Sequence, residues 1–344
     1  MLDRFALADL DIRILGAPMA GGPSTPALAA AVSNAGGLGF LAGGMVSADD
    51  LADTITAARR QTSGPLGVNL FVPQRPVATA DQLSAFAAAL EEDAERYGIA
   101  LGAPRVVDDE WGEWAAKLDV VCDLRPELVS FTFGSPPEWH CRRLRDVGIM
   151  PVATVTTVRE AVIALNQGAA ALVAQGPGAG GHRATFDVLD APPCDSLDDL
   201  VGALIACFDC PIVAAGGLAT RADVQRMRNA GAAGVQLGTA LLLADEAGTN
   251  SVHRAALREP RRFTETVVTR AFTGRYARAL NNRFIARHDG DAIFGFPQVA
   301  MMTAPLQAAA LKVGDPHGLA MWAGTAFGKT KTGPAGDIVR ELAG

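Results

Sequence analysis

The sequence has few lysines and no concentrated positive charge. Its 344 residues carry 30 Lys and Arg against 37 Asp and Glu, a formal net charge of −7. Only four of these cations are lysines, namely Lys117, Lys312, Lys329 and Lys331. Nucleic acids and anionic membranes bind to clustered cationic faces, so the composition argues against both as partners.

Long apolar runs are also missing. No stretch approaches the roughly 18 apolar residues of a membrane-spanning helix, and the start, Met-Leu-Asp-Arg-Phe, lacks the pattern of a signal peptide. The five cysteines are odd in number and scattered, which speaks against a disulfide framework and a four-cysteine zinc site. We therefore expect a cytoplasmic protein without a metal site.

What the chain does have is a repeated alternation of short apolar runs and helical segments. The runs are continuously apolar rather than alternating, which is typical of parallel strands covered on both faces. There are eight of them: Ile12–Ala20, Gly37–Ala42, Leu66–Val72, Leu128–Phe133, Met150–Val155, Ala171–Gln175, Pro211–Ala215 and Gly234–Leu237. Helices are expected after Ser or Thr caps, at Pro26–Asn34, Ala48–Arg60, Val158–Asn166 and Arg221–Asn229.

Eight such units predict an α/β fold of the (β/α)8 TIM-barrel type, spanning residues 1–245. The connection between the third and fourth runs, near 73–126, is too long for one crossover helix and is expected to contain a helical insertion. Residues 246–344 are expected to be mainly helical and to form a smaller lid or substrate domain over the barrel mouth.

The sixth run ends in Gly176-Pro-Gly-Ala-Gly-Gly181, followed by His182. The glycines let backbone approach a ligand closely, and the histidine places a titratable group beside it. The same glycines match the dinucleotide fingerprint G-x-G-x-x-G, but the strand is sixth rather than first and no helix follows directly. A loop histidine bonded only to backbone is the alternative interpretation of His182.

Two further glycine turns follow the last two runs, at Gly216-Gly217 and Gly238-Thr239. In TIM barrels, paired loops at these positions bind a phosphate through backbone N–H groups. The pattern fits flavin mononucleotide (FMN) and a sugar phosphate alike. Other barrel chemistries lack their residues, because no lysine, His-x-His pair or Gly-x-Ser-x-Gly motif stands at a strand end.

Motifs along nearly the whole chain resemble one family. They are Ala17–Pro26, Val32–Gly39, Gly67–Phe71, Val129–Gly134, Gln175–Arg183, Ala215–Leu218, Gln236–Thr239, Phe272–Arg275, Ala304–Leu306 and Trp322–Gly324. In this order they are similar to the bacterial nitronate monooxygenases, also called 2-nitropropane dioxygenases, which are FMN-dependent (β/α)8 barrels.

The resemblance implies a site and a reaction. The implied FMN-binding residues are Met19, Ala20, Asn69, Gln175, Gly180, Gly181, Gly216, Gly217, Gln236, Leu237, Gly238 and Thr239. His182 would lie beside the flavin, either as the base that removes the α-proton of a nitroalkane or as a hydrogen-bond donor to a nitronate. In the family's reaction a nitronate gives an electron to FMN, and O2 completes its conversion to a carbonyl compound and nitrite.

The chain departs from the family's common Glu-Ala-Gly-Gly-His-Arg-Gly at both ends, with Gly178 and Ala184. The segment Phe296–Thr303 is apolar where relatives carry hydroxyls, which favours a more apolar pocket rim and a larger substrate. We expect Trp139, Trp322, Met301 and Met302 to pack in the core or lid rather than to recognise substrate.

Two alternative functions remain open at the level of sequence. Related FMN barrels of the quinone or enoyl reductase type take hydride from NAD(P)H, and a non-catalytic flavin-binding protein would share the same glycine loops. A homodimer is compatible with the resemblance.

Overall fold

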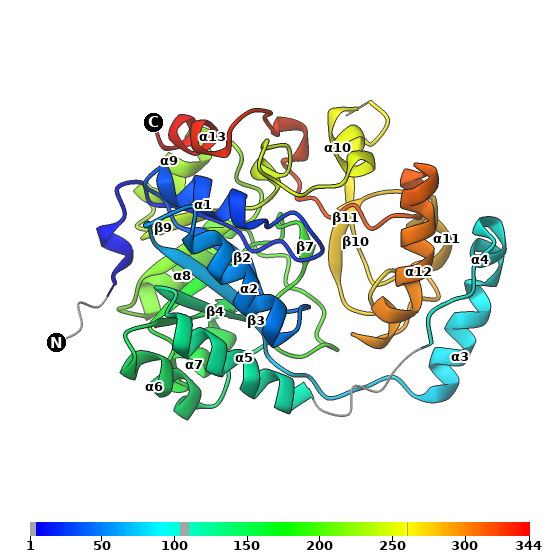
Figure 1. Ribbon diagram of the computed structural model, residues 1–344, viewed down its shortest axis with the longest axis horizontal. Helices are drawn as coiled ribbons and strands as arrows, with labels where there is room; N and C mark the ends of the chain where they lie inside the picture. Colours follow the sequence, from blue (N-terminus) through cyan, green and yellow to red (C-terminus); the bar gives the residue numbers. More distant parts are fainter. Residues whose placement is uncertain (1–4, 104–109, 260) are drawn as a thin grey trace.

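The computed structural model describes residues 5–103, 110–259 and 261–344, with side chains from 113 onward in the second range. Eight parallel strands in these residues form one sheet, in the order β1-β9-β8-β6-β5-β4-β3-β2. The edge strands meet through Leu15 and Leu38, whose segments exchange backbone hydrogen bonds of 2.9 and 3.1 Å. The sheet thereby closes into a (β/α)8 TIM barrel, as predicted (Figure 1).

The strands agree closely with the eight apolar runs. Three strands have the predicted bounds and five are shorter, the first most of all. The apolar runs continue into loops beyond the residues that form hydrogen bonds to neighbouring strands. The strand bounds are β1 Ile14–Gly16, β2 Gly39–Ala42, β3 Leu66–Phe71, β4 Leu128–Thr132, β5 Met150–Val155, β6 Ala171–Gln175, β8 Ile212–Ala215 and β9 Gly234–Leu237.

The four expected helices form with their expected caps. Thr25, Ser47, Thr157 and Thr220 each accept a hydrogen bond from the backbone N–H three residues on. The barrel helices are α1 Pro26–Asn34, α2 Ala48–Arg59, α5 Glu110–Leu124, α6 Glu138–Asp146, α7 Val158–Asn166, α8 Leu197–Cys207 and α9 Arg221–Asn229.

Alternate residues of the strands face two different cores, which explains why the runs are continuously apolar. Leu15, Phe40, Val152, Val173 and Val213 belong to the cluster that fills the barrel. Their neighbours Ile14, Ala153, Leu172, Ile212 and Val235 pack outward against the helices. Both faces of every strand are therefore removed from water.

The third connection divides its helices between two places. α5 packs on α2 and serves as the crossover helix of the barrel. α3 (Ala80–Ala89) and α4 (Glu91–Tyr97) instead lie against α12 (Gln298–Val313), away from the barrel. Figure 1 shows this pair beside α11 (Arg283–His288) and α12.

The region after residue 245 contains strands that the sequence did not predict. β10 (Thr266–Thr269) and β11 (Ala277–Leu280) form an antiparallel pair, and β7 (Gly181–His182) adds to the edge of β11. The remaining elements are η1 Leu7–Asp9, η2 Thr239–Leu241, α10 Ser251–Arg258, η3 Pro316–Gly318, η4 Phe327–Lys329 and α13 Ala335–Ala343.

The C-terminal helix α13 packs on α1 and α9 at the outside of the barrel, so this part of the region does not cover the mouth. The boundary at residue 245 stays a prediction.

Trp139 does not pack as expected. It lies on the outer side of α6 with 57% of its surface exposed, whereas Met302 is fully buried. The prediction of core or lid packing was therefore wrong for Trp139. No helix in the described ranges is long and apolar enough to cross a membrane.

Candidate functional site

The predicted site residues come together at the carboxyl edge of the barrel. Met19 and Ala20 follow β1, Asn69 lies near the end of β3, and Gln175 is the last residue of β6. Gly216-Gly217 follows β8 directly, and Gly238-Thr239 follows β9 directly. Parallel strands of a barrel end on one face, so residues distant in sequence meet there.

The glycine run after β6 is held as a bent loop that returns as β7. The side-chain amide of Gln175 donates to the carbonyl of His182 at 3.1 Å and accepts from the N–H of Ala184 at 3.0 Å. The guanidinium of Arg183, 1% exposed, donates to the carbonyl of Gly176 at 2.6 Å. Gln175 thus braces the loop that presents His182.

Three aromatic rings surround the imidazole of His182. The ring centroids of Phe133, Phe296 and Trp322 lie 5.7, 5.3 and 5.6 Å from that of the imidazole. On its polar side, Nε2 of His182 is 3.0 Å from Oγ1 of Thr273, and this hydroxyl donates to the carbonyl of Arg275 at 3.1 Å.

The electrostatic surroundings keep His182 uncharged. Burial against protein atoms, with the nearby Arg275 guanidinium, lowers the pKa of His182 to about 3. Arg275 is itself 1% exposed, and its guanidinium carbon lies 3.9 Å from the ring centroid of Phe133. Burial lowers the pKa of Arg275 to about 10, so the guanidinium remains charged at neutral pH.

Three residues around His182 were not predicted as site residues: Phe133, Thr273 and Arg275. Phe296 belongs to the segment that was expected at the pocket rim, and Trp322, which was expected to pack in the core or lid, lies beside the imidazole. Phe133 has φ of +71°, a left-handed conformation that costs a bulky residue about 1–3 kcal/mol. Its ring nonetheless contacts both Arg275 and His182. Thr273 and Arg275 belong to the motif Phe272–Arg275, which contributed to the family resemblance, but the sequence alone did not indicate a role for either residue.

The two glycine loops have unpaired backbone donors. Within the described chain, the N–H groups of Gly217, Gly238 and Thr239 donate to no protein acceptor. The segment after Trp322 joins these loops to the glycine run, because Gly324 donates to Oγ1 of Thr239 at 2.9 Å and Thr325 donates to the carbonyl of Gly178 at 3.0 Å. The loops and the His182 segment therefore form one assembly.

Two side-chain amides at the same edge keep polar atoms for a ligand. Asn69 donates through Nδ2 to Ser130 and Thr132, which fixes its plane and leaves Oδ1 without a partner in the described chain. The Gln236 side chain makes no hydrogen bond there and is not sealed from solvent. Gly238 stands next to Met19, whose Sδ would be 3.7 Å from an added Cβ.

The departures from the family motif have structural reasons. A Cβ at Gly178 would lie 2.8 Å from Oγ1 of Thr325 and 3.1 Å from Cα of Gly217, so a glutamate does not fit without a shift. Ala184 is fully buried, and its methyl group is accommodated behind the loop.

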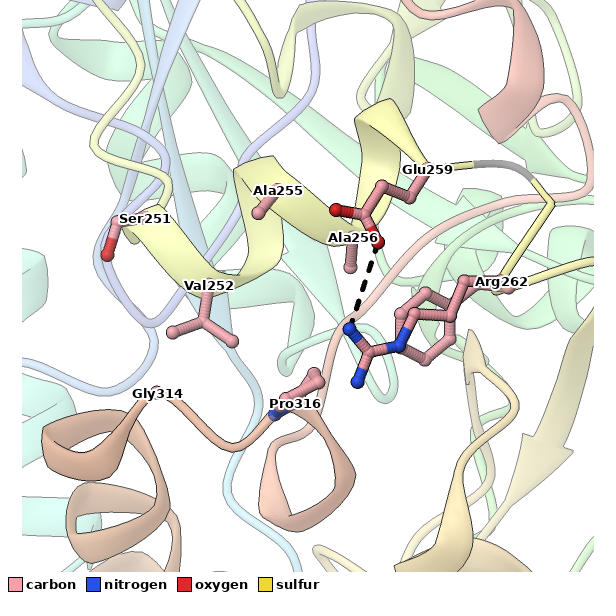
Figure 2. A pocket seen from close by; sticks show the side chains of 9 residues that line it. Ser251, Val252, Ala255, Ala256, Glu259, Arg262, Gly314 and Pro316 are labelled. Carbon is pink, nitrogen blue, oxygen red and sulfur yellow. Dashed lines mark ion pairs between the residues drawn. The ribbon is translucent and has the colours of Figure 1, made fainter.

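A second concave feature is separate from this site. A pocket beside α10 has a volume of about 200 Å³, and Figure 2 shows the side chains that line it. It contains an ion pair of 3.8 Å between Glu259 and Arg262, and Pro316 faces this pair. None of the predicted site residues lines it. In the described ranges, no three His, Cys, Asp or Glu side chains gather as a metal site would require.

Comparisons with known proteins agree on one family. Residues 6–344 match the profile described as nitronate monooxygenase. A probable nitronate monooxygenase of Staphylococcus aureus (strain MSSA476) is 34% identical over 98% of this chain and 94% of its own. The crystal structure of nitroalkane oxidase from Streptomyces ansochromogenes is 40% identical, with a TM-score of 0.93 over 98% of this chain and 96% of its own. FabK from Thermotoga maritima, 24% identical with a TM-score of 0.74 over 98% and 93% of the chains, shares the fold.

Proposed function

The chain belongs to the nitronate monooxygenase family and is a flavin-dependent oxidoreductase, and from this premise we propose that its flavin is FMN and that it oxidises alkyl nitronates and nitroalkanes with O2 to carbonyl compounds and nitrite. The observation that carries the proposal is the convergence of a neutral His182 with the N–H groups of Gly217, Gly238 and Thr239, which donate to no acceptor in the described chain.

The residues fit a phosphorylated flavin. The unpaired N–H groups of Gly217, Gly238 and Thr239 suit a phosphate, and the positive φ of Gly217, +73°, is a conformation that side chains rarely adopt. Oδ1 of Asn69 and the amide of Gln236 suit the polar edge of a flat ring. Met19, Ala20, Gly180, Gly181, Gly216 and Leu237 would supply apolar and backbone contacts, and Gln175 would act by bracing the loop.

The bound flavin supplies the capacity to accept electrons from the substrate and pass them to O2. The chain's own residues do the rest. Phe133, Phe296 and Trp322 surround the imidazole with apolar surface, which suits an alkyl group and excludes water. The buried Arg275 guanidinium contacts the ring of Phe133, and this ring in turn contacts His182. Its positive charge stabilises negative charge that develops near the imidazole.

His182 can act as the base. Since burial and the Arg275 guanidinium lower its pKa to about 3, the imidazole is uncharged and has a lone pair open to the α-proton of a neutral nitroalkane, but it is a weak base. The proton transfer therefore depends on stabilisation of the negative charge that develops on the nitronate, which the buried Arg275 cation supplies. Protonation then turns it into a donor that can hold the resulting nitronate. A nitronate added as substrate has already lost this proton and does not require the base.

The test is oxidation without a nicotinamide. The purified protein should be yellow and release FMN on denaturation. It should consume O2 and release nitrite from propyl-1-nitronate and from 1-nitropropane with no NAD(P)H present. His182→Ala should keep its flavin and lose activity on 1-nitropropane by about 10²-fold or more.

Three results would contradict the proposal. Protein that does not bind FMN would refute the assigned cofactor. Steady NAD(P)H oxidation without activity on either nitro compound would favour a reductase. A His182→Ala variant with full activity would remove this residue from the reaction.

A further inference from the structure

His182 is the first member of a short hydrogen-bond chain. Its Nε2 is 3.0 Å from Oγ1 of Thr273, and Oγ1 of Thr273 donates to the carbonyl oxygen of Arg275 at 3.1 Å. Thr273 is 7% exposed, so water does not readily replace either partner.

The proton count of this chain favours one arrangement. A carbonyl oxygen only accepts, so both contacts of Thr273 become hydrogen bonds only when its single hydroxyl proton points to Arg275 and Nε2 of His182 donates to Oγ1. A hydroxyl turned toward Nε2 instead leaves the carbonyl of Arg275 without a donor in the described chain and makes one bond fewer. In the neutral ring Nδ1 is therefore the atom with the free lone pair.

Nδ1 of His182 is also the atom that a ligand can reach. It makes no hydrogen bond within the described chain, and unlike some other unpaired side-chain atoms it is not sealed from solvent. In contrast, Nδ1 of His140, Nε2 of His253 and Nδ1 of His317 lack a partner in the described chain and are sealed from solvent.

Thr273 is held by backbone on several sides. The N–H groups of Thr273 and Gly274 both donate to the carbonyl of Arg270, at 3.2 and 2.8 Å. Oγ1 of Thr303 on α12 donates to the carbonyl of Phe272 at 2.7 Å. β7 and β11 pair His182 with Ala277. The distance between the imidazole and the hydroxyl is thus set by the sheet and the turn together.

We propose that Thr273 is a positioning residue that holds His182 as the Nε2–H tautomer, so that Nδ1 is the atom that takes the α-proton of a nitroalkane. In this step the C–H bond breaks, its electron pair forms the C=N bond of the nitronate while the π pair of one N=O bond moves onto oxygen, and the proton moves to Nδ1. Nε2–H stays on Thr273 throughout. The role of Nδ1 in deprotonating a nitroalkane rests on the proposed function, whereas the assignment of the Nε2–H tautomer does not.

The tautomer can be read directly by NMR. In protein labelled with 15N-histidine, long-range 1H–15N spectra distinguish a protonated Nε2 from a protonated Nδ1, and His182→Ala assigns the signals. We expect the Nε2–H form in the wild type and in Thr273→Ser. Thr273→Val, which keeps the shape but removes the hydroxyl, should shift the ring toward Nδ1–H.

Kinetics with two substrates give a second test. Thr273→Val should lower kcat/KM for 1-nitropropane by about 10- to 100-fold and leave that for propyl-1-nitronate within about threefold, since only the nitroalkane needs a base. Thr273→Ser should restore the loss. Thr249→Val is the matched control, because Thr249 is equally buried and its hydroxyl has no partner in the described chain.

A wild-type ring in the Nδ1–H form would overturn the proposal. So would an equal loss on both substrates in Thr273→Val, or a serine variant that fails to restore activity. If the wild type oxidised neither substrate, the proposed function would fail while the NMR spectra would still decide the role of Thr273.

Discussion

At the scale of the residue, the side chains around His182 determine the charge and protonation of its imidazole. Phe133, Phe296 and Trp322 supply apolar surface, and Thr273 supplies one hydrogen bond. The charged group that acts on the ring is the Arg275 guanidinium. Both burial and a like charge disfavour the imidazolium, so the two effects add.

This arrangement predicts the pH dependence of nitroalkane oxidation. Because the pKa of His182 is lowered to about 3, the base is already deprotonated at mildly acidic pH. We expect kcat/KM for 1-nitropropane to stay flat between about pH 5.5 and 7.5, without the fall that protonation of an ordinary histidine would cause.

The measurement is the initial rate of O2 uptake across this range, with propyl-1-nitronate as the comparison substrate. An acidic limb with a midpoint near the ordinary histidine pKa, seen with the nitroalkane alone, would show that His182 is more exposed or less influenced by Arg275 than the structure indicates.

At the scale of the element, the connection from β6 to β7 depends on close backbone packing. A Cβ at Gly180 would lie 2.5 Å from both the carbonyl carbon of Ala323 and the nitrogen of Gly324. These are backbone atoms, which cannot rotate away. The glycine is therefore required for the segment after Trp322 to lie over the loop and reach Thr239.

Gly180→Ala should accordingly separate the two segments. We expect it to destabilise the fold by about 1–3 kcal/mol and to reduce flavin content, because the loops that would hold the phosphate lose their common support. Urea unfolding and the ratio of flavin to protein absorbance measure the two effects.

Gly202→Ala is the control. Gly202 is exposed within α8 and has open space around an added Cβ, so the alanine should stabilise the helix by about 1 kcal/mol and leave flavin content unchanged. If Gly180→Ala kept its full flavin content, the segment after Trp322 would not support the cofactor loops.

At the scale of the whole molecule, the insertion between β3 and β4 is attached to the C-terminal region. Phe86 and Leu90 join the apolar cluster of Phe272, Phe284 and Met302. On α4, Oδ2 of Asp93 lies 2.7 Å from Nε2 of His288 on α11, and both side chains are 4% exposed. α3 and α4 thus pack on the region that carries Thr273 (Figure 1).

Asp93→Ala should loosen this attachment. Removing one member of a buried polar pair leaves the other without its partner, which typically costs about 1–3 kcal/mol. We expect a lower unfolding midpoint in urea and faster proteolysis within residues 73–126.

Glu92→Gln is the matched control. Glu92 lies next to Asp93 on α4 and forms an exposed ion pair with Arg287 on α11, so removal of its charge should change stability little. Equal stability of Asp93→Ala and the wild type would mean that the apolar cluster alone holds the insertion in place.

The sequence determined the barrel and the place of its ligand. Continuous apolar runs, Ser and Thr caps and glycine turns are local signals, and they predicted all eight strands and four helices within a few residues. Because parallel strands end on one face, the positions of Gly217, Gly238 and His182 in their runs sufficed to predict one shared site.

Only the tertiary structure decided what surrounds His182. Thr273 and Arg275 lie more than ninety positions along the chain, in a turn before a strand that was not predicted, and they reach the imidazole through the pairing of β7 with β11. Which nitrogen carries the proton, and whether the ring is charged, depends on contacts between segments that no local pattern encodes. Capping and periodicity depend on neighbouring residues in the sequence, whereas the charge and tautomer of His182 are set by the side chains that the fold packs against its ring.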